Sequence, residues 1–382
     1  MQQQIRAYKF RLYPSKKQIK ELNHHIWISK ELWNTMLATV KDSYQKTGKF
    51  PSKQELMEMV KNNCLYSQTG QMVALRLLDA VKRKITMKKK GINAGFPRFK
   101  SFYQINSLNY PQFGFSLNDK KLKVTPFGEM SIKRHREIKG KIKTLSLKRE
   151  PSGKWFAIFA VIEPEPKPKS NAGPAIGIDL GLMNFATLSD ETVIKNPHHF
   201  RRLEDKLAFQ QRNLSRKKKR SKNQGKARLK VAKVHDQIAN ARKDYLHKTA
   251  NFILSKYSLV AMEELQPQKM AMRGHAKGIN DAAWGMFANI LSYKAESAGS
   301  RVVFVNPRQT SSMCSRCGSN VRKSLYERSH NCNVCGLFID RDINAAINIL
   351  NRATGGTPGS NACQDDAIVS SMKQEAYAFM RG

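Results

Sequence analysis

Four cysteines constrain the fold of this chain more than any other feature. They form two C-x-x-C pairs fourteen residues apart, each followed by glycine: Cys314, Cys317, Cys332 and Cys335. This spacing is typical of a site in which four thiolates bind one zinc ion. A structural zinc with four tetrahedral ligands leaves no position open for substrate, so we expect one Zn²⁺ that stabilises a small lobe and performs no chemistry. Four unrelated cysteines, or a disulfide pair, are the alternative interpretation.

The charge of the chain indicates its partner. Among 382 residues, 68 Lys and Arg stand against 29 Asp and Glu, a formal charge of +39. So large an excess favours a polyanion, and RNA and DNA are the obvious candidates. A membrane surface also attracts basic proteins, but no apolar run is long enough to span a bilayer and MQQQIRAYKF lacks a signal-peptide core. We therefore expect a soluble, intracellular protein with no membrane partner.

The first half of the chain divides into a strand, a helical segment and a sheet. IRAYKFRLYP alternates apolar and polar residues and stops at Pro14, as a strand would. Between residues 17 and 90, apolar residues recur at intervals of three and four, which predicts helices. From FPRFKSFYQ to IEPEP, short alternating runs broken by Gly and Pro predict an antiparallel barrel or sheet. The Pro-rich, charged residues 163–174 are typical of a linker.

In the second half, three separated segments each place an acid at the end or start of a core element. The strand in AIGIDLG carries Asp179, and the strand in SLVAMEEL ends in Glu263 and Glu264. The helix predicted for DRDINAAINIL begins beside Asp340 and Asp342. Three such carboxylates, one of them Asp340 or Asp342, suit a phosphodiesterase with two Mg²⁺ or Mn²⁺ ions about 4 Å apart. Structural alternatives are Asp340 as a helix N-cap and Glu264 as a surface charge.

A basic segment lies between the first two of these strands. Residues 201–233 contain fourteen Lys or Arg but only two acids, inside a helical pattern that continues towards Leu254. The densest cluster is Lys217, Lys218, Lys219 and Arg220. Such a cluster beside a carboxylate strand predicts contacts with nucleic-acid phosphates, and a merely solvated surface is the alternative.

Four motifs in this half resemble one known family. GIDLGLMNFATLSD, VAMEELQ, TSSMCSRCGSNV with CNVCG, and DRDINAAINIL are similar, in this order, to the RuvC-type nuclease domain of TnpB, the transposon-encoded RNA-guided DNA endonucleases related to type V CRISPR effectors. The motifs span residues 173–350, and FRLYPSKKQ and FPRFKS resemble the N-terminal segments of the family more loosely. The resemblance implies that Asp179, Glu263 and Asp342 are the catalytic, Mg²⁺-binding acids and that Asp340 is a neighbour.

The resemblance also implies an α/β fold with a ribonuclease-H-like (RuvC) nuclease domain, an inserted zinc ribbon, a helical recognition lobe and a wedge-like β-barrel. The expected domains are the first barrel strand (1–15), the helical recognition lobe (16–95), the remainder of the barrel (96–168), the first part of the RuvC-like domain (169–306), the zinc-ribbon insert (307–338), the last RuvC helix (339–352) and a disordered tail (353–382).

The function implied by the resemblance is RNA-guided cleavage of double-stranded DNA beside a short flanking motif, with a guide RNA derived from the transposon end. One alternative is a guide-independent transposase or resolvase on the same fold, and another is a nuclease-silent, RNA-guided repressor. All three catalytic positions are acidic, which favours an active nuclease. We expect a cytoplasmic protein of a bacterial or archaeal cell, associated with the nucleoid when on DNA.

Overall fold

The computed structural model describes residues 3–61, 63–164, 171–265, 276–324 and 326–355. The chain divides into two compact units, residues 1–165 with 214–233 and residues 166–213 with 234–382. Across the described ranges, no helix is both long enough and apolar enough to cross a membrane.

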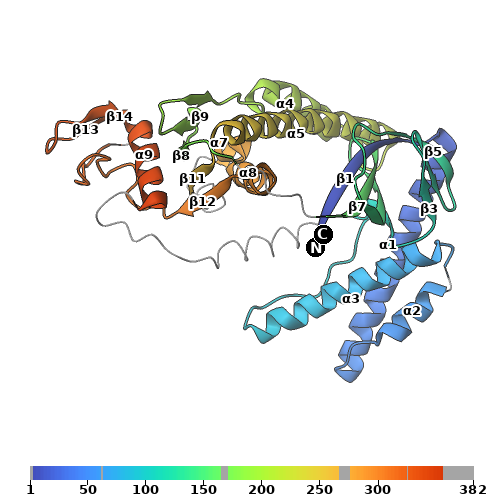
Figure 1. Ribbon diagram of the computed structural model, residues 1–382. Helices are drawn as coiled ribbons and strands as arrows, with labels where there is room; N and C mark the ends of the chain where they lie inside the picture. Colours follow the sequence, from blue (N-terminus) through green and yellow to red (C-terminus); the bar gives the residue numbers. More distant parts are fainter. Residues whose placement is uncertain (1–2, 62, 165–170, 266–275, 325, 356–382) are drawn as a thin grey trace. The chain divides into compact units, whose positions relative to one another are not determined.

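The first unit is built on a seven-stranded antiparallel sheet in the order β2-β6-β7-β1-β5-β4-β3. Its strands are β1 (Gln3–Tyr13), β2 (Ser107–Tyr110), β3 (Phe115–Leu117), β4 (Lys121–Val124), β5 (Gly128–Lys133), β6 (Lys141–Arg149) and β7 (Trp155–Pro164). The long strand β1 pairs with β7 on one side and with β5 on the other (Figure 1). The Tyr110 hydroxyl of β2 donates a 2.9 Å hydrogen bond to the Thr125 carbonyl beyond β4, so the curled sheet is barrel-like and nearly closed.

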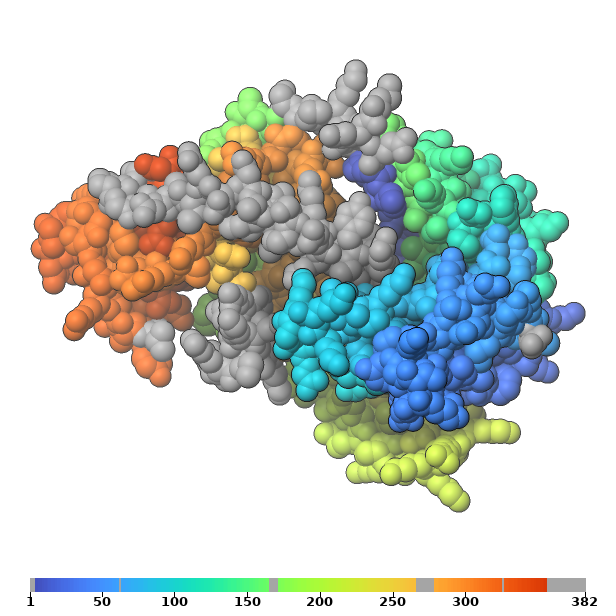
Figure 2. Space-filling model, turned by 90° about the horizontal axis from the view of Figure 1, so that it is seen from below, coloured from blue at the N-terminus to red at the C-terminus, as the bar shows by residue number. Residues whose placement is uncertain are grey.

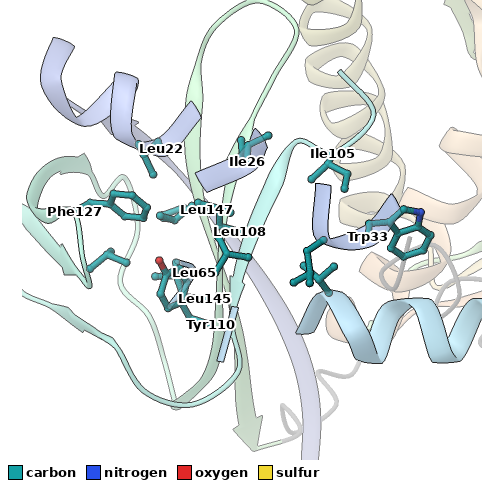
Figure 3. Packing of buried hydrophobic residues seen from close by; sticks show 14 of the residues in the cluster. Leu22, Ile26, Trp33, Leu65, Ile105, Leu108, Tyr110, Phe127, Leu145 and Leu147 are labelled. Atoms are coloured by element: carbon teal, nitrogen blue, oxygen red, sulfur yellow. The ribbon is translucent and has the colours of Figure 1, made fainter. Parts of the chain in front are cut away.

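Three helices complete this unit: α1 (Lys16–Thr47) and α3 (Ser67–Lys89) pack against strand β2 of the sheet, and α2 (Lys53–Lys61) packs on α1 and α3. A capping box fixes the start of α1, because Ser15 and Gln18 exchange hydrogen bonds of 2.9 and 3.2 Å. The buried stripe of α1 includes Leu22, Ile26 and Trp33, and these side chains share one core with Leu108 and Leu147 of the sheet (Figure 3). Seen from below, the three helices gather into one blue-to-cyan mass (Figure 2).

The second unit contains a five-stranded sheet in the order β10-β9-β8-β11-β12. Its strands are β8 (Ala175–Leu180), β9 (Asn184–Leu188), β10 (Val193–Lys195), β11 (Leu259–Glu263) and β12 (Arg301–Val305). The strands β8, β11 and β12 are parallel, and β9 and β10 extend the sheet with antiparallel pairs. Its helices are α4 (Arg201–Ser215), α5 (Lys222–Lys256), α7 (Ala276–Ala282), α8 (Trp284–Ala298) and α9 (Arg341–Thr354), of which α5 begins in the first unit. The insert adds a two-stranded antiparallel ribbon, β13 (Ser329–Asn331) and β14 (Phe338–Asp340).

Helix α9 lies unusually close to strand β8. A Cβ atom at Gly177 would stand 2.0 Å from the Ala346 carbonyl oxygen and 2.8 Å from the Leu350 nitrogen. Only glycine therefore allows this approach, which brings the first turn of α9 to the same sheet as the strands that carry acids.

The linker expected over residues 163–174 is shorter in the structure. Strand β7 continues to Pro164 because β1 supplies it with a partner, and the buried Glu163 accepts a hydrogen bond from the Tyr8 hydroxyl. Asn171 donates to the Leu254 and Tyr257 carbonyls at 3.1 and 2.9 Å. Residues 165–170 lie outside the described part of the chain.

Two further expectations need correction. The basic segment 201–233 is not continuously helical: α4 ends at Ser215, α5 begins at Lys222, and Arg220 between them has a positive φ of 63°. The cluster Lys217–Arg220 therefore lies on a connection. Helix α9 runs past residue 352 to Thr354, and Gly355 closes it in the left-handed conformation. Most of the expected tail, residues 356–382, lies outside the described residues.

Candidate functional site

Parallel strand pairing brings Asp179 and Glu263 together. The two acids belong to the neighbouring strands β8 and β11, whose register pairs Ile178 with Met262, one residue before each acid. Because paired residues in a sheet project on the same face, the two carboxylates are neighbours. Asp342 comes from the first turn of α9, which packs on β8 and β11. The structure thus gathers the three acids that the sequence indicated from three separate elements.

Ionising all three carboxylates of this cluster at once is unfavourable when no cation is bound. Burial raises the pKa of Asp179 well above its usual range, and the negative charges of Glu263 and Asp342 raise the same pKa further. Burial also raises the pKa of Glu263, while the hydrogen bond from Thr310 and the charge of Arg352 oppose that shift. Carboxylates that repel one another in this way are stabilised when cations bind between them.

The three carboxylates do not form a compact ligand cluster like that of the four cysteines. Among the described residues, only the four cysteines bring three or more ligand atoms within 4.8 Å of one another. Oxygen donors contributed by three separate elements suit Mg²⁺ or Mn²⁺.

Asp340 and Asp342 have different surroundings. Asp340 is the N-cap of α9, and its Oδ1 accepts hydrogen bonds from the Asp342 and Ile343 nitrogens at 2.8 and 3.2 Å. The N-cap alternative for Asp340 is therefore confirmed. Asp342 accepts from the Arg341 Nε at 3.3 Å, and its charge acts on Asp179 more strongly than that of Asp340. Glu264 is exposed, as the surface-charge alternative expected.

The four cysteines converge in the insert. The Sγ atoms of Cys314 and Cys335 lie 3.6 Å apart, as do those of Cys317 and Cys332. Four thiolates around one zinc at about 2.3 Å would be separated by about 3.8 Å along each edge of the tetrahedron, so the observed spacing fits this metal.

Glycine follows each cysteine pair for a conformational reason. Gly318 and Gly336 have positive φ values of 76° and 70°. Their nitrogens donate to the Cys314 and Cys332 carbonyls at 2.9 and 2.8 Å, closing a tight turn around each C-x-x-C pair. The left-handed conformation of each turn favours glycine.

Hydrogen bonds connect the insert to the acids. Thr310, at the entry to the insert, donates its hydroxyl to Glu263, and the buried Asn348 of α9 donates to the Thr310 and Met313 carbonyls at 2.9 and 2.7 Å. Asn344 donates to the same Met313 carbonyl at 2.7 Å and accepts from the Ser315 nitrogen at 2.9 Å. The helix that carries Asp342 is thus attached to the first cysteine turn.

Sequence reasoning did not assign roles to Thr310 and Asn348. A usable signal for the second was present, because two asparagines four residues apart, Asn344 and Asn348, interrupt the apolar face of the predicted helix. Buried amides at such positions need hydrogen-bond partners, and the neighbouring insert is where those partners lie.

Comparison with known proteins identifies the family. Residues 159–273 match the OrfB/IS605 family model described as "Probable transposase", and residues 284–349 match the "Cas12f1-like, TNB domain". A Streptomyces pristinaespiralis protein named as an RNA-guided DNA endonuclease is 32% identical over 366 residues, covering 92% of this chain and 90% of its own length. The chain belongs to the TnpB family. InsQ of Escherichia coli K12, also named as an RNA-guided DNA endonuclease, is 28% identical over 372 residues, which cover 91% of this chain and 92% of its own length.

A solved structure shares the TnpB-family fold seen here. The cryo-EM structure of the Cas12f1–sgRNA–target DNA complex aligns with a TM-score of 0.55 at 13% identity, covering 91% of this chain and 99% of that one. Residues 1–49 match a family model described as "Helix-turn-helix domain". Within this range, Gln3–Tyr13 form strand β1 and Lys16–Thr47 form the single 32-residue helix α1.

Proposed function

We propose that this TnpB-family chain is an RNA-guided, metal-dependent DNA endonuclease, in which a guide RNA from the transposon end selects double-stranded DNA beside a short flanking motif. The observation that carries the proposal is the convergence of Asp179, Glu263 and Asp342 in a chain whose full-length relatives are named as RNA-guided DNA endonucleases. An acid cluster of this kind has no evident structural use, since its members repel one another.

The residues of the site fit two divalent ions. When bound, Mg²⁺ or Mn²⁺ ions would activate a water molecule and stabilise the leaving oxygen of a phosphodiester. Asp179, Glu263 and Asp342 supply the oxygen ligands from β8, β11 and α9. Thr310 orients Glu263 through its hydroxyl, and Arg341 orients Asp342.

The cysteine cluster would hold one structural Zn²⁺. Its four thiolates form a closed ligand shell, so its contribution is to the fold. Because Asn344 and Asn348 attach the first cysteine turn to α9, a metal-ordered insert also fixes the helix that presents Asp342.

The basic residues serve nucleic-acid binding in this proposal. A charge of +39 is compatible with a stable protein when RNA and DNA phosphates neutralise it. Lys217, Lys218, Lys219 and Arg220 are all exposed on the connection between α4 and α5, where they can reach phosphates. The helices α1–α3 and the barrel-like sheet would form the lobe that holds the guide.

A guide-independent transposase or resolvase is the second candidate, favoured by the description of the family model over residues 159–273. The test is to purify the protein from cells that carry the transposon end, sequence any bound RNA, and assay DNA cleavage with Mg²⁺ before and after ribonuclease treatment. RNA guidance predicts a defined bound RNA and loss of cleavage once it is digested. Equal cleavage by RNA-free protein would favour the second candidate.

A further inference from the structure

A small pocket in the first unit is lined by two cations and an aromatic ring. Trp33 comes from α1, Arg76 from α3, Lys100 from the segment before β2, and Ser107 and Asn109 from β2 itself. The Lys100 ammonium lies 3.7 Å from the centre of the Trp33 ring. In the close view, Trp33 lies beside Ile105, which forms part of the apolar floor (Figure 3).

The fold holds Lys100 in place at its backbone. Asn34 donates to the Lys100 carbonyl at 2.9 Å and accepts from the Lys100 nitrogen at 2.8 Å. The neighbouring Trp33 donates its indole N–H to the Arg98 carbonyl at 3.2 Å. Two consecutive residues of α1 therefore fix both the course of this segment and the ring beneath the ammonium, so the position of Lys100 is preorganised.

Among the residues that the structure describes, the two cations have no acidic partner. Within the described part of the chain, no carboxylate forms an ion pair with Lys100 or Arg76. Burial lowers the pKa of Lys100 to about 8, with a further contribution from the positive charge of Arg76, and burial also lowers the pKa of Arg76. Half-buried like charges are costly to a fold unless an anion compensates them.

We propose that this pocket binds one phosphate group of a nucleic-acid backbone, with Lys100 and Arg76 as the charged ligands and Ser107 and Asn109 as neutral hydrogen-bond donors. The inference rests on the proposed function, which supplies the nucleic acid. The guanidinium of Arg76 can donate two hydrogen bonds to one phosphate, and the Trp33 ring supports Lys100 without neutralising it.

The test compares the salt dependence of binding. Each phosphate contact contributes about 0.7 for single strands, or about 0.9 for duplex DNA, to the slope of log K against log salt. The double variant Lys100→Met with Arg76→Met should lose one such contribution. A matched control is Lys61→Met with Lys121→Met, which removes two exposed lysines of the same unit that already pair with Glu58 and Glu129 at 2.8 and 3.0 Å.

Two titrations identify the source of the phosphate. Guide RNA is titrated into RNA-free protein, and target DNA into the protein–RNA complex. A reduced slope in the first titration assigns the phosphate to the RNA, and a reduced slope only in the second assigns it to the DNA. Slopes equal to those of the control in both titrations overturn the proposal, provided that circular dichroism shows the variant to be folded.

The pH dependence of nucleic-acid binding gives a second readout, through the protonation of Lys100. The groups that face Lys100 are Arg76 from α3, Trp33 from α1 and the neutral Ser107 and Asn109 from β2. Since only protonated Lys100 attracts phosphate, affinity should be constant well below pH 8 and fall as the pH rises through about 8, and Lys100→Arg should abolish this fall. The same fall in Lys100→Arg would contradict the assignment.

Thermal melting separates a binding role from a structural one. Removing an uncompensated cation should leave the melting temperature of the RNA-free double variant unchanged or higher. A lower melting temperature with unchanged affinity would show that the pair serves the fold. Wild-type protein that binds neither RNA nor DNA would instead contradict the proposed function itself.

Discussion

Asp340 and Asp342 stand two residues apart in the sequence, yet their carboxylates have different roles in the fold. The first satisfies two backbone nitrogens at the start of α9, and the charge of the second acts on Asp179. The sequence alone left both open as the third acid, because a helix start attracts acids for capping as well as for chemistry.

Substitution of the two aspartates should separate these roles. Asp342→Ala should abolish DNA cleavage and leave RNA and target binding nearly intact, because the metals serve chemistry more than affinity. Asp340→Ala should retain measurable cleavage and lower the free energy of unfolding by about 1 kcal/mol, the usual cost of a lost N-cap. Cleavage rates and denaturant unfolding measure both effects. Full activity in Asp342→Ala, or none in Asp340→Ala, would reverse the assignment.

At the scale of elements, the contact between β8 and α9 determines where Asp342 lies. Gly177→Ala would force the Cβ atom against the Ala346 carbonyl, so we expect the free energy of unfolding to fall by about 1–3 kcal/mol and cleavage to fall with it. Gly225→Ala in α5 is the matched control, because its Cβ would meet open space and helical alanine is favoured over glycine. Equal effects of the two substitutions on cleavage would contradict this account.

The insert is a second element on which the site depends. If the cysteines hold one zinc, purified protein should contain about one zinc per chain, and Cys314→Ser should release it because the closed shell loses a thiolate. Cleavage should then fall, since the first cysteine turn is attached to α9 through Asn344 and Asn348. Metal analysis and cleavage rates are the measurements. Zinc-free protein with normal cleavage would refute the connection.

Much of this architecture was predictable because the signals are local. Buried strands appear as apolar runs, and the acids at the ends of β8 and β11 follow such runs directly. The mixed α/β fold and the convergence of the cysteines were anticipated correctly. The break between α4 and α5 was missed although Ser221 and Gln224 carry a capping pattern: Ser221 accepts from the Gln224 nitrogen at 3.1 Å.

Other features depend on contacts that no local pattern contains. The hydrogen bond from Thr310 to Glu263 joins residues 47 positions apart, and the end of β7 is a strand because β1 lies beside it. A proline-rich composition indicated a linker there, but tertiary pairing overrides such local preferences. The two cations Arg76 and Lys100 likewise become neighbours only after α3 and the segment before β2 have packed together.

At the scale of the whole molecule, the excess of positive charge has to be matched by bound phosphate. Neutralising Lys217, Lys218, Lys219 and Arg220 together should weaken nucleic-acid binding and reduce its salt slope by up to about 3.6, four contacts at about 0.7 to 0.9 each. Filter binding over a salt series measures the change. An unchanged slope would restore the interpretation that this connection is only a solvated surface.

The central claim is that the guide RNA selects the target DNA and that cleavage of this DNA depends on Asp179, Glu263 and Asp342. The most direct test supplies the purified protein with either of two guide RNAs that differ only in their pairing segment, and offers both matching DNAs in one reaction with Mg²⁺. We predict that each guide directs cleavage to its own DNA and that Asp179→Ala cuts neither. Cleavage of both DNAs with either guide, or undiminished cleavage by Asp179→Ala, would contradict the account.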